Sequence, residues 1–330
     1  MQTCVIFNPS ARGEKAESLC ARAQSLFPNC AWQRTTQAGQ ARVLAAQAVR
    51  GGFQTIIAAG GDGTANEVVN GIGDVPGGFD STHFGVLPLG TINVFARELG
   101  LPRHLAGAIQ VLREGKTTAI DLGRADYTDA GSPRQRFFIQ LAGAGLDSRA
   151  IELVNWELKK KLGPLAYIVA GCKAMRETQP VIVAHTETPV SGQMVLIGNG
   201  RFYGGSFAVF PAASLQDGLL EVRVLPKVTW PRLMAAALGL LTGRLYEFCP
   251  ALQFSLRSVT LTSASRVTLQ LDGESACELP ATLSILPKAL RVIVPRPESL
   301  AIPSGARSSR PHPSASRRRN QSSETGSPFG

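Results

Sequence analysis

Short apolar segments and amphipathic segments alternate along the first hundred residues. Runs of four or five mostly apolar residues, followed by asparagine, glycine or proline, predict buried strands. The expected strands cover 3–7, 35–39, 55–59 and 84–87, and the expected helices cover 14–26, 40–50, 65–72 and 92–99. Strands that alternate with helices are typical of a parallel sheet with helices on both faces. We therefore expect an α/β domain over residues 1–125.

The pattern changes at about residue 121, where short strands separated by glycine, proline and serine turns replace this alternation. Such strands predict a mainly antiparallel β-sandwich domain over residues 126–289. Helical segments interrupt them at 147–176 and at 231–244. The last strand, 290–295, can pair in either domain, so residues 290–300 are candidates for a return to the first one. The serine, arginine and proline beyond position 303 predict a disordered basic tail over 303–330.

The chain is long enough for two domains, and its charge is positive. It has 330 residues, of which 44% are hydrophobic and 18% charged. The formal net charge is +10, and the last 28 residues carry +4 of it through five arginines and one glutamate. Such charge is compatible with nucleotides, anionic lipid surfaces or nucleic acid, and it selects none of them. Because nothing besides net charge points to nucleic acid, we expect no nucleic-acid partner.

Six cysteines and four histidines are scattered along the chain without the spacing of a zinc site. We expect free thiols, as in a reducing cytosol. The N-terminus lacks the basic start and the long apolar run of a signal peptide. The most apolar window, 233–241, has nine residues and is too short to cross a bilayer. The sequence therefore predicts a cytoplasmic protein that is not integral to a membrane.

The segment GGDGT at 60–64 connects a predicted strand to a predicted helix. Ligands of open α/β sheets bind at the carboxyl ends of strands. Glycines let the backbone approach phosphate oxygens closely, and the following helix directs free N–H groups towards them. A plain turn capped by Asp62 needs fewer glycines. We therefore expect a phosphate-binding loop, in which Thr64 adds a hydroxyl donor and helps to cap the helix.

This loop fits neither of two common phosphate-binding patterns. The P-loop requires a lysine that is absent here, and the dinucleotide-binding pattern requires a glycine where Asn66 stands. The carboxylate of Asp62 would repel polyphosphate unless a divalent cation, or a proton to be removed, lies between them. The pattern therefore favours metal-assisted phosphoryl transfer over passive cofactor binding.

The longer segment GGDGTANEVVNG resembles the nucleotide-binding motif of the diacylglycerol kinase catalytic-domain family, which includes sphingosine kinases and bacterial lipid kinases. GGDGT alone is also similar to NAD kinases and phosphofructokinases, whereas Asn66-Glu67 and Asn70-Gly71 point to the lipid kinases. Further segments resemble the family in the same order: NPSARG at 8–13, TTQAGQA at 35–41, LPLGTINVFARELGLP at 87–102, IGNGRFYGGSFAVFPAASLQDGLLEV at 197–222 and LDGE at 271–274. The similarity covers about residues 3–295.

The resemblance implies an ATP site on the N-terminal domain. Its nucleotide-binding positions would be Asn8, Pro9, Ser10, Thr35, Gly61, Asp62, Gly63, Thr64, Ala65, Asn66, Glu67 and Thr91. The pattern of strands agrees, because three of these loops follow predicted parallel strands and would converge on one crevice. Taken alone, Gly90-Thr91 also fits a turn with a helix cap.

The resemblance also implies a metal site and a catalytic base in the second domain. Asp217 would be a ligand of Mg²⁺, assisted by backbone carbonyls near Ser214 and Leu219, and oxygen ligands suit this ion. Phosphoryl transfer to an alcohol requires a carboxylate that accepts the hydroxyl proton. The resemblance places this base in 272–274, and strand alternation gives Asp272 and Glu274 the same face, so the sequence leaves both as candidates. Asp62 is a further catalytic candidate.

The chain departs from the family pattern at two positions. Val94 stands where many members carry an aspartate, so any metal or substrate contact of that aspartate is absent. Ser206 replaces the third glycine of the NGRFYGG segment, so that loop is expected to differ slightly.

We therefore predict a Mg²⁺-dependent lipid kinase that transfers the γ-phosphoryl group of ATP to the hydroxyl of diacylglycerol or a related lipid. The enzyme would associate peripherally with the membrane surface through apolar residues in 231–243. The sequence does not distinguish a monomer from a homo-oligomer. Two alternatives are a kinase of a soluble acceptor, similar to NAD kinases, and a non-catalytic nucleotide-binding regulator.

Overall fold

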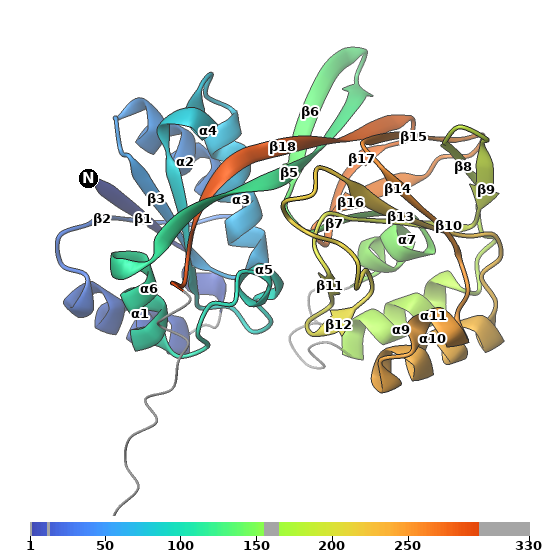
Figure 1. The fold of residues 1–330 in the computed structure, drawn as a ribbon, viewed down its shortest axis with the longest axis horizontal. Helices are drawn as coiled ribbons and strands as arrows, with labels where there is room; N and C mark the ends of the chain where they lie inside the picture. The colour runs from blue at the N-terminus through green and yellow to red at the C-terminus, as the bar shows by residue number, and fades with distance from the viewer. Residues whose placement is uncertain (1, 12–13, 155–164, 297–330) are drawn as a thin grey trace, which may run out of the picture. The chain divides into compact units, whose positions relative to one another are not determined.

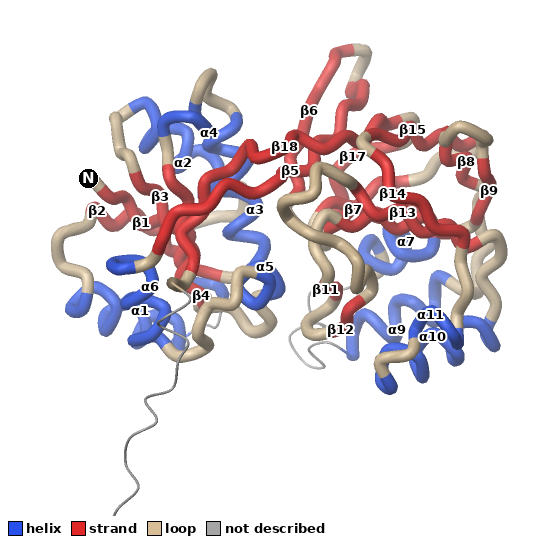
Figure 2. Tube along the Cα trace, in the orientation of Figure 1, coloured by secondary structure: helices blue, strands red, loops and turns tan. Residues whose placement is uncertain are grey.

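The fold is taken from a computed structural model of the chain, which describes residues 2–11, 14–154 and 165–296 (Figure 1). The predicted basic tail over 303–330 lies outside the described residues. Figure 2 shows helices and strands mixed in the N-terminal part and strands predominating in the rest.

The N-terminal part contains a parallel sheet with the order β2-β1-β3-β4. Its strands are β1 (Thr3–Phe7), β2 (Ala31–Arg34), β3 (Thr55–Gly60) and β4 (His83–Pro88). Its helices are η1 (Pro9–Ala11), α1 (Glu14–Leu26), α2 (Gln40–Arg50), α3 (Asp62–Gly73), α4 (Gly78–Ser81), α5 (Val94–Glu98) and α6 (Leu105–Glu114). Every residue of β3 is buried, as expected for a central strand covered on both faces.

Three predicted boundaries in this part were wrong. Residues 35–39 do not form a strand, because β2 covers Ala31–Arg34 instead. Trp32 of β2 packs against the N-terminal core. Gly39 has a left-handed φ of 79°, which is not strand geometry, and precedes α2 as its N-cap. Helix α3 begins at Asp62 instead of residue 65, so the GGDGT segment is largely the first turn of the helix. Helix α5 is shorter than predicted because Asn93, with φ 54°, is not helical.

Two long antiparallel strands, β5 (Lys116–Asp129) and β18 (Ala281–Val294), extend from the N-terminal sheet into the C-terminal part (Figure 1). Val292 of β18 pairs with Phe84 of β4 in parallel orientation. Leu290 and Val292 belong to the N-terminal core, whereas Leu283 belongs to the C-terminal core. The last strand of the chain therefore contributes to both hydrophobic cores.

The C-terminal part contains two large antiparallel sheets and a separate antiparallel pair of short strands, 202–203 and 207–208. The remaining strands are β6 (Ser132–Phe138), β7 (Leu141–Gly145), β8 (Ile182–His185), β9 (Val190–Gly192), β10 (Met194–Gly198), β11 (Phe202–Tyr203), β12 (Phe207–Ala208), β13 (Leu220–Leu225), β14 (Leu252–Leu256), β15 (Ser258–Ser263), β16 (Thr268–Leu271) and β17 (Glu274–Glu278). One sheet has the order β14-β13-β10-β7-β16-β17, and β18-β15-β8-β9 continues the N-terminal sheet. Buried side chains of both sheets form one core cluster, as in a sandwich. The predicted fold class is confirmed.

The C-terminal helices are α7 (Leu146–Glu152), α9 (Leu165–Ala174), α10 (Trp230–Thr242) and α11 (Leu245–Phe248). The single helix predicted over 147–176 was wrong, since α7 ends at Glu152 and α9 begins at Leu165. The sequence has a proline at 164, immediately before α9, and proline disfavours continuation of a helix. Among the described residues, no helix has both the length and the hydropathy needed to span a bilayer.

Candidate active site

The loops that follow β1, β3 and β4 meet at one edge of the N-terminal sheet. The backbone N–H of Asn8 donates to the carbonyl of Ala59 at 3.0 Å, and that of Gly90 donates to the carbonyl of Gly60 at 3.0 Å. A Cβ atom on Gly90 would lie 2.5 Å from the Cα of Gly61, so these two loops pack backbone against backbone. The close approach explains why glycine occupies position 90.

The side chains of the first loops stabilise this arrangement. Asn8 Nδ2 donates to Thr64 Oγ1 at 3.1 Å, and Asn8 Oδ1 accepts from the backbone N–H of Ser10 at 3.0 Å. Pro9 and Ser10 begin η1, and Ser10 is exposed. The buried Thr35 is held through its N–H, which donates to the carbonyl of Phe7 at 2.9 Å. The residues predicted from the first two motifs therefore adjoin the GGDGT loop.

The N-terminus of α3 can accept an anion. Its N-cap, Gly61, has no side chain and makes no capping hydrogen bond, and Ala65 donates the first intrahelical bond to Gly61. The N–H groups of the first helical turn therefore lack a side-chain cap, and the half-exposed Gly61 and Gly63 have no side chains of their own to cover them. Free N–H groups and the helix dipole favour phosphate at such a terminus. The residues present thus fit a bound nucleotide phosphate.

Asp62 connects the two glycine-containing loops. Its carboxylate oxygens accept the backbone N–H groups of Val94 and Phe95, each at 3.0 Å, and so cap the N-terminus of α5. We expected this carboxylate to face a cation or a proton, whereas both oxygens are engaged by backbone donors. Its visible role is to fix the loop that carries Thr91, which is exposed beside it.

The next residues of the motif support the loop from behind. Glu67 accepts the backbone N–H groups of Gly39 and Ala41, each at 3.0 Å, and so caps the N-terminus of α2. Ala65 is 2% exposed and lies in the core, so its side chain has no free surface for a ligand. Asn66 is also buried, and it points towards the C-terminal strands.

Asp272 is half-buried and is held by four hydrogen-bond donors. Its carboxylate accepts the backbone N–H groups of Ile139 (2.7 Å), Gln140 (2.8 Å) and Leu141 (3.0 Å) and Asn66 Nδ2 (2.7 Å). Burial raises the pKa of this carboxyl group, and the four hydrogen bonds act in the opposite direction. Because both of its oxygens already accept two donors each, Asp272 is less well placed than a free carboxylate to accept a substrate proton.

Glu274 is only two residues further on, but its surroundings differ. Its side chain is 42% exposed, and its Oε2 pairs with Arg136 Nη2 at 2.7 Å. Its Oε1 lies 3.0 Å from the position that a Cβ atom on Gly63 would occupy, which places the carboxylate at the start of α3. Asp272 and Gly273 have φ angles of 49° and 86°, so the chain turns between the two acids and strand alternation does not relate them.

The loop predicted to hold a metal packs around a buried carboxylate. Asp121 of β5 accepts the backbone N–H groups of Gly218 and Lys288, each at 2.7 Å. Asp217 is exposed, and its Oδ1 accepts the N–H of Leu219 at 3.0 Å. In the described ranges, no group of three acidic, histidine or cysteine side chains could hold a metal ion, and no hydrogen bond joins this loop to the glycine loops.

The donor set of this loop suits a hard cation only in part. The carboxylate of Asp217 and the exposed hydroxyl of Ser214 are oxygen donors, although Ser214 Oγ already accepts the N–H of Gln216 at 3.3 Å. A bound Mg²⁺ would therefore depend on Asp217, backbone carbonyls and water.

Sequence reasoning did not identify a buried polar network beneath the 272–274 turn. Asp147 is half-buried and accepts hydrogen bonds from the hydroxyl of Tyr203 and from Gln270 Nε2, the latter at 2.8 Å. Burial raises the pKa of Asp147, and its two donors act to lower it. Gln270 Oε1 in turn accepts the N–H of Gly273 at 2.8 Å. The sequence signal for this network was a polar residue in each of two apolar runs, Asp147 in LAGAGLD and Gln270 in VTLQL, since buried polar groups need hydrogen-bond partners.

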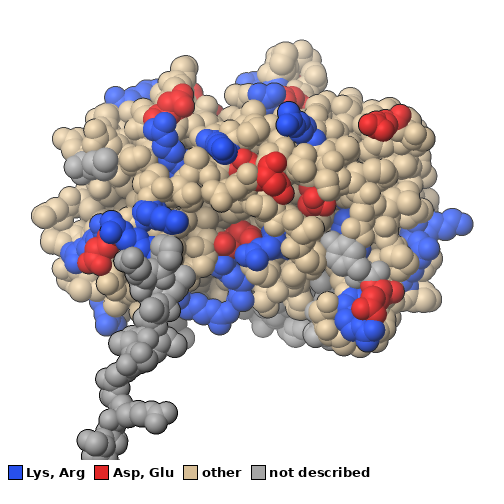
Figure 3. All heavy atoms as spheres, in the orientation of Figure 1, with Lys and Arg blue, Asp and Glu red and all other residues tan. Residues whose placement is uncertain are grey.

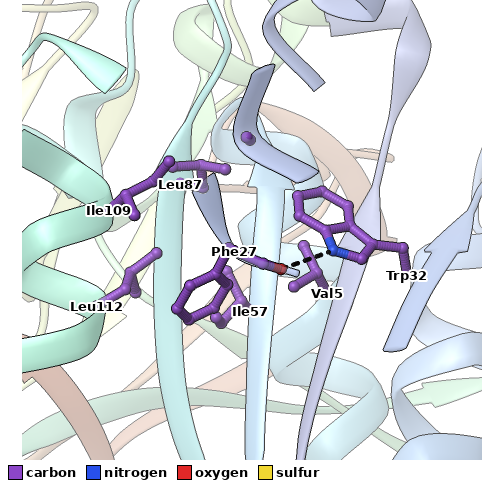
Figure 4. Close-up of a pocket in the computed structure, with 8 residues that line it drawn as sticks. Val5, Phe27, Trp32, Ile57, Leu87, Ile109 and Leu112 are labelled. Atoms are coloured by element: carbon purple, nitrogen blue, oxygen red, sulfur yellow. Dashed lines mark hydrogen bonds between the residues drawn. The ribbon is translucent and has the colours of Figure 1, made fainter. Parts of the chain in front are cut away.

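Two cavities lie in the N-terminal part, and neither contains the predicted catalytic residues. One is lined entirely by apolar side chains of the core, including Val5, Phe27 and Trp32, and is too narrow for a water molecule (Figure 4). The other, of about 180 Å³, is lined by residues of α1, β1 and β2, among them Phe7 and Arg34. These two residues directly precede Asn8 and Thr35, so the second cavity adjoins the predicted nucleotide positions.

Comparisons with known proteins agree with this architecture. The family model described as "Diacylglycerol kinase catalytic domain" matches residues 2–125, and "YegS C-terminal NAD kinase beta sandwich-like domain" matches residues 140–294. A diacylglycerol kinase from Staphylococcus epidermidis is 28% identical over 300 residues, which cover 88% of this chain and 92% of that protein. A diacylglycerol kinase from Staphylococcus haemolyticus is 29% identical over 266 residues, covering 79% of this chain and 77% of that protein.

Solved structures show the same fold. A crystal structure of a diacylglycerol kinase from Bacillus anthracis matches with a TM-score of 0.66 at 21% identity, covering 91% of this chain and 98% of that one. Another structure from this organism matches with a TM-score of 0.72 at 22% identity, covering 90% of this chain and 96% of that one. The N-terminal part of the chain, residues 2–125, is thus similar to the diacylglycerol kinase catalytic domain, and residues 140–294 are similar to the C-terminal domain named above. The chain is an enzyme of the lipid kinase class.

Proposed function

We propose that this enzyme transfers the γ-phosphoryl group of ATP to the hydroxyl of diacylglycerol or a related membrane lipid. The observation that carries the proposal is the position of Glu274, whose half-exposed carboxylate lies at Gly63, beside the uncapped N-terminus of α3. A phosphate-binding helix terminus and a carboxylate base are thereby within one site. The relatives' names supply the identity of the lipid, since those proteins are diacylglycerol kinases.

The N-terminal loops would bind the nucleotide. ATP supplies the phosphoryl group, and Gly61 and Gly63 allow its phosphates to approach the N–H groups of α3. Asn8, Thr64 and Thr91 offer polar groups around this position. Asp62 and Glu67 would act indirectly, because they hold the neighbouring helix termini of α5 and α2. Positioning of this kind is the main contribution a protein makes to phosphoryl transfer.

Glu274 would accept the proton of the acceptor hydroxyl as its oxygen bonds to phosphorus. The ion pair with Arg136 orients the carboxylate. Asp272 would act as a positioning residue, because its hydrogen bonds join Asn66 of α3 to the segment 139–141, which connects β6 to β7. Bound Mg²⁺ supplies charge neutralisation, and Asp217, with backbone carbonyls near Ser214 and Leu219, would hold it.

A direct test incubates the purified chain with labelled ATP, Mg²⁺ and mixed micelles of candidate lipids, with a water-soluble acceptor such as NAD in parallel. We expect label on diacylglycerol or a related lipid alcohol and none on NAD. Glu274→Gln should reduce transfer by roughly 10²–10⁴-fold. Glu278→Gln is the matched control, since Glu278 is on the same strand, is 47% exposed and also pairs with an arginine. Transfer to NAD, or full activity of Glu274→Gln, would refute the proposal.

A further inference from the structure

Helix α10 presents an apolar face that the described residues leave uncovered. Trp230, Met234 and Leu238 are 46%, 67% and 48% exposed. Their spacing of four residues places them on one side of the helix, with the exposed Ala237 between them. The opposite side packs inward through Leu233 and Ala236. Three large exposed apolar side chains on one helix of 13 residues are more than scattered surface residues would give.

The exposed apolar residues continue from α10 towards the active site. Helix α10 lies against β12, where Phe207 is 37% exposed. In the turn before β12, a Cβ atom on Gly205 would lie 3.6 Å from Ile92, which is also 37% exposed. Ile92 follows Thr91, one of the proposed nucleotide-binding residues. The apolar side chains thus lead from the helix to the edge of the proposed site.

Basic residues outnumber acidic ones around this face, and the acids that follow the two helical segments, Glu177 and Glu247, pair with Arg149 and Arg244. The sequence from 226 to 244 contains Lys227, Arg232 and Arg244 and no acidic residue. The neighbouring segment 165–176 contains Lys173 and Arg176, again without an acid. Lys173, Arg176, Lys227 and Arg232 are exposed, and the described residues show no ion pair for any of them. Figure 3 shows basic and acidic side chains interspersed over this view of the molecule, including the lower right, where Figure 1 has α10 and α11.

We infer that the α10 face, formed by Trp230, Met234 and Leu238, docks the enzyme onto an anionic phospholipid bilayer. An apolar helix face flanked by lysine and arginine is suited to lie in the interfacial region of such a membrane. The apolar side chains enter the acyl boundary, and the basic ones remain at the headgroups. The inference rests on the proposed lipid acceptor, because docking there brings the path along Phe207 and Ile92 to the membrane that contains it.

Vesicle binding without ATP tests the surface separately from catalysis. The full chain is mixed with phosphatidylglycerol–phosphatidylcholine vesicles and bound protein is measured by flotation. The triple variant Trp230→Ser, Met234→Ser, Leu238→Ser should bind about a hundredfold more weakly, since most of the apolar area of the face is removed. Val43→Ser is the matched control, because Val43 is 54% exposed on α2, and its binding should not change.

Charge variants and activity measurements provide a second test of the docking surface. Lys227→Gln with Arg232→Gln should weaken binding to phosphatidylglycerol vesicles and reduce its salt dependence, while pure phosphatidylcholine vesicles bind wild type weakly. With a short-chain diacylglycerol kept below its micellar concentration, the triple variant should match wild type, whereas its KM for vesicle-borne diacylglycerol should rise. If wild type phosphorylates neither the short-chain nor the vesicle-borne diacylglycerol, the proposed function is refuted, whereas the result of the vesicle-binding assay is unaffected.

Three outcomes would overturn the docking inference. Equal vesicle binding by the triple variant and wild type would show that another surface is used. Absence of wild-type binding to any vesicle would show that the face does not meet a membrane. A wild-type dimer that the triple variant converts to a monomer, without vesicle binding, would show that a second copy of the chain covers the face. Circular dichroism confirms that each variant is folded.

Discussion

Asp272 and Glu274 are only two positions apart, yet replacing them should have different effects. Replacing Asp272 should mainly lower the stability of the fold, and replacing Glu274 should mainly lower the rate of phosphoryl transfer. In Asp272→Asn the shape is kept, but the amide retains one oxygen where the carboxylate served four donors. That oxygen can accept from two of them, and two buried donors lose their acceptor. At roughly 1–3 kcal/mol for each unsatisfied donor, the free energy of unfolding should fall by about 2–6 kcal/mol. This is a large part of the roughly 5–15 kcal/mol typical of a folded domain.

Glu274→Gln should behave in the opposite way. Its carboxylate is 42% exposed and has one ion pair, and exposed pairs of this kind contribute about 0–1 kcal/mol. Stability should therefore change by less than about 1 kcal/mol, while phosphoryl transfer falls by roughly 10²–10⁴-fold through loss of the base.

Urea unfolding followed by circular dichroism measures the first quantity, and transfer of labelled phosphate from ATP measures the second. Activity of Asp272→Asn is measured at low temperature, where the folded fraction is highest. If Asp272→Asn unfolds at the wild-type urea concentration but is inactive, Asp272 is the base and the assignment of the two acids is reversed.

Three further expectations follow from individual contacts. Burial raises the pKa of the Cys4 thiol from 9.0 to about 11. The folded state holds this proton to a higher pH than the unfolded chain, so the stabilisation is complete below about pH 9 and is lost as the pH rises to about 11. Between these pH values the free energy of unfolding should therefore fall less steeply with pH in Cys4→Ala than in wild type. Equal slopes for the two proteins would contradict the reasoning. Gly71→Ala would place a Cβ atom 2.1 Å from the carbonyl oxygen of Arg42 and should cost roughly 1–3 kcal/mol in thermal unfolding, whereas Gly171→Ala, with no atom within 4 Å, should be neutral or stabilising by up to about 1 kcal/mol. Asp62→Ala removes the cap of α5 and should cost about 1 kcal/mol, yet it should weaken ATP binding in calorimetry, because the Thr91 loop loses its attachment; unchanged affinity would show that the loop is fixed by other contacts.

The fold was largely predictable because its signals are local. Apolar periodicity identified β1, β3, β4 and the helices α1 and α2, whose boundaries agree with the prediction at or near every end. The alternation of strands and helices determined the parallel sheet. The pairing of β18 with β4 and β5 could not be predicted, because the paired residues are 154 to 208 positions apart in the sequence and no local pattern encodes such contacts.

The site was predictable by position but not by the orientation of its side chains. Motif spacing located Asn8, Gly61 and Gly90, and their loops do adjoin. The distinction between Asp272 and Glu274 depends on two positive φ angles, which strand alternation does not contain. The Asp147 network likewise depends on tertiary contacts between distant strands and a helix.

The dual membership of β18 has a consequence for how the chain acquires its structure. Leu290, Val292 and Ile293 belong to the N-terminal core, although about 150 residues separate β18 from β5 in the sequence. An N-terminal fragment that stops after β5 would leave β4 without its β18 partner, as an open sheet edge available to other chains. We therefore expect the nucleotide-binding half to need β18 before its sheet is complete.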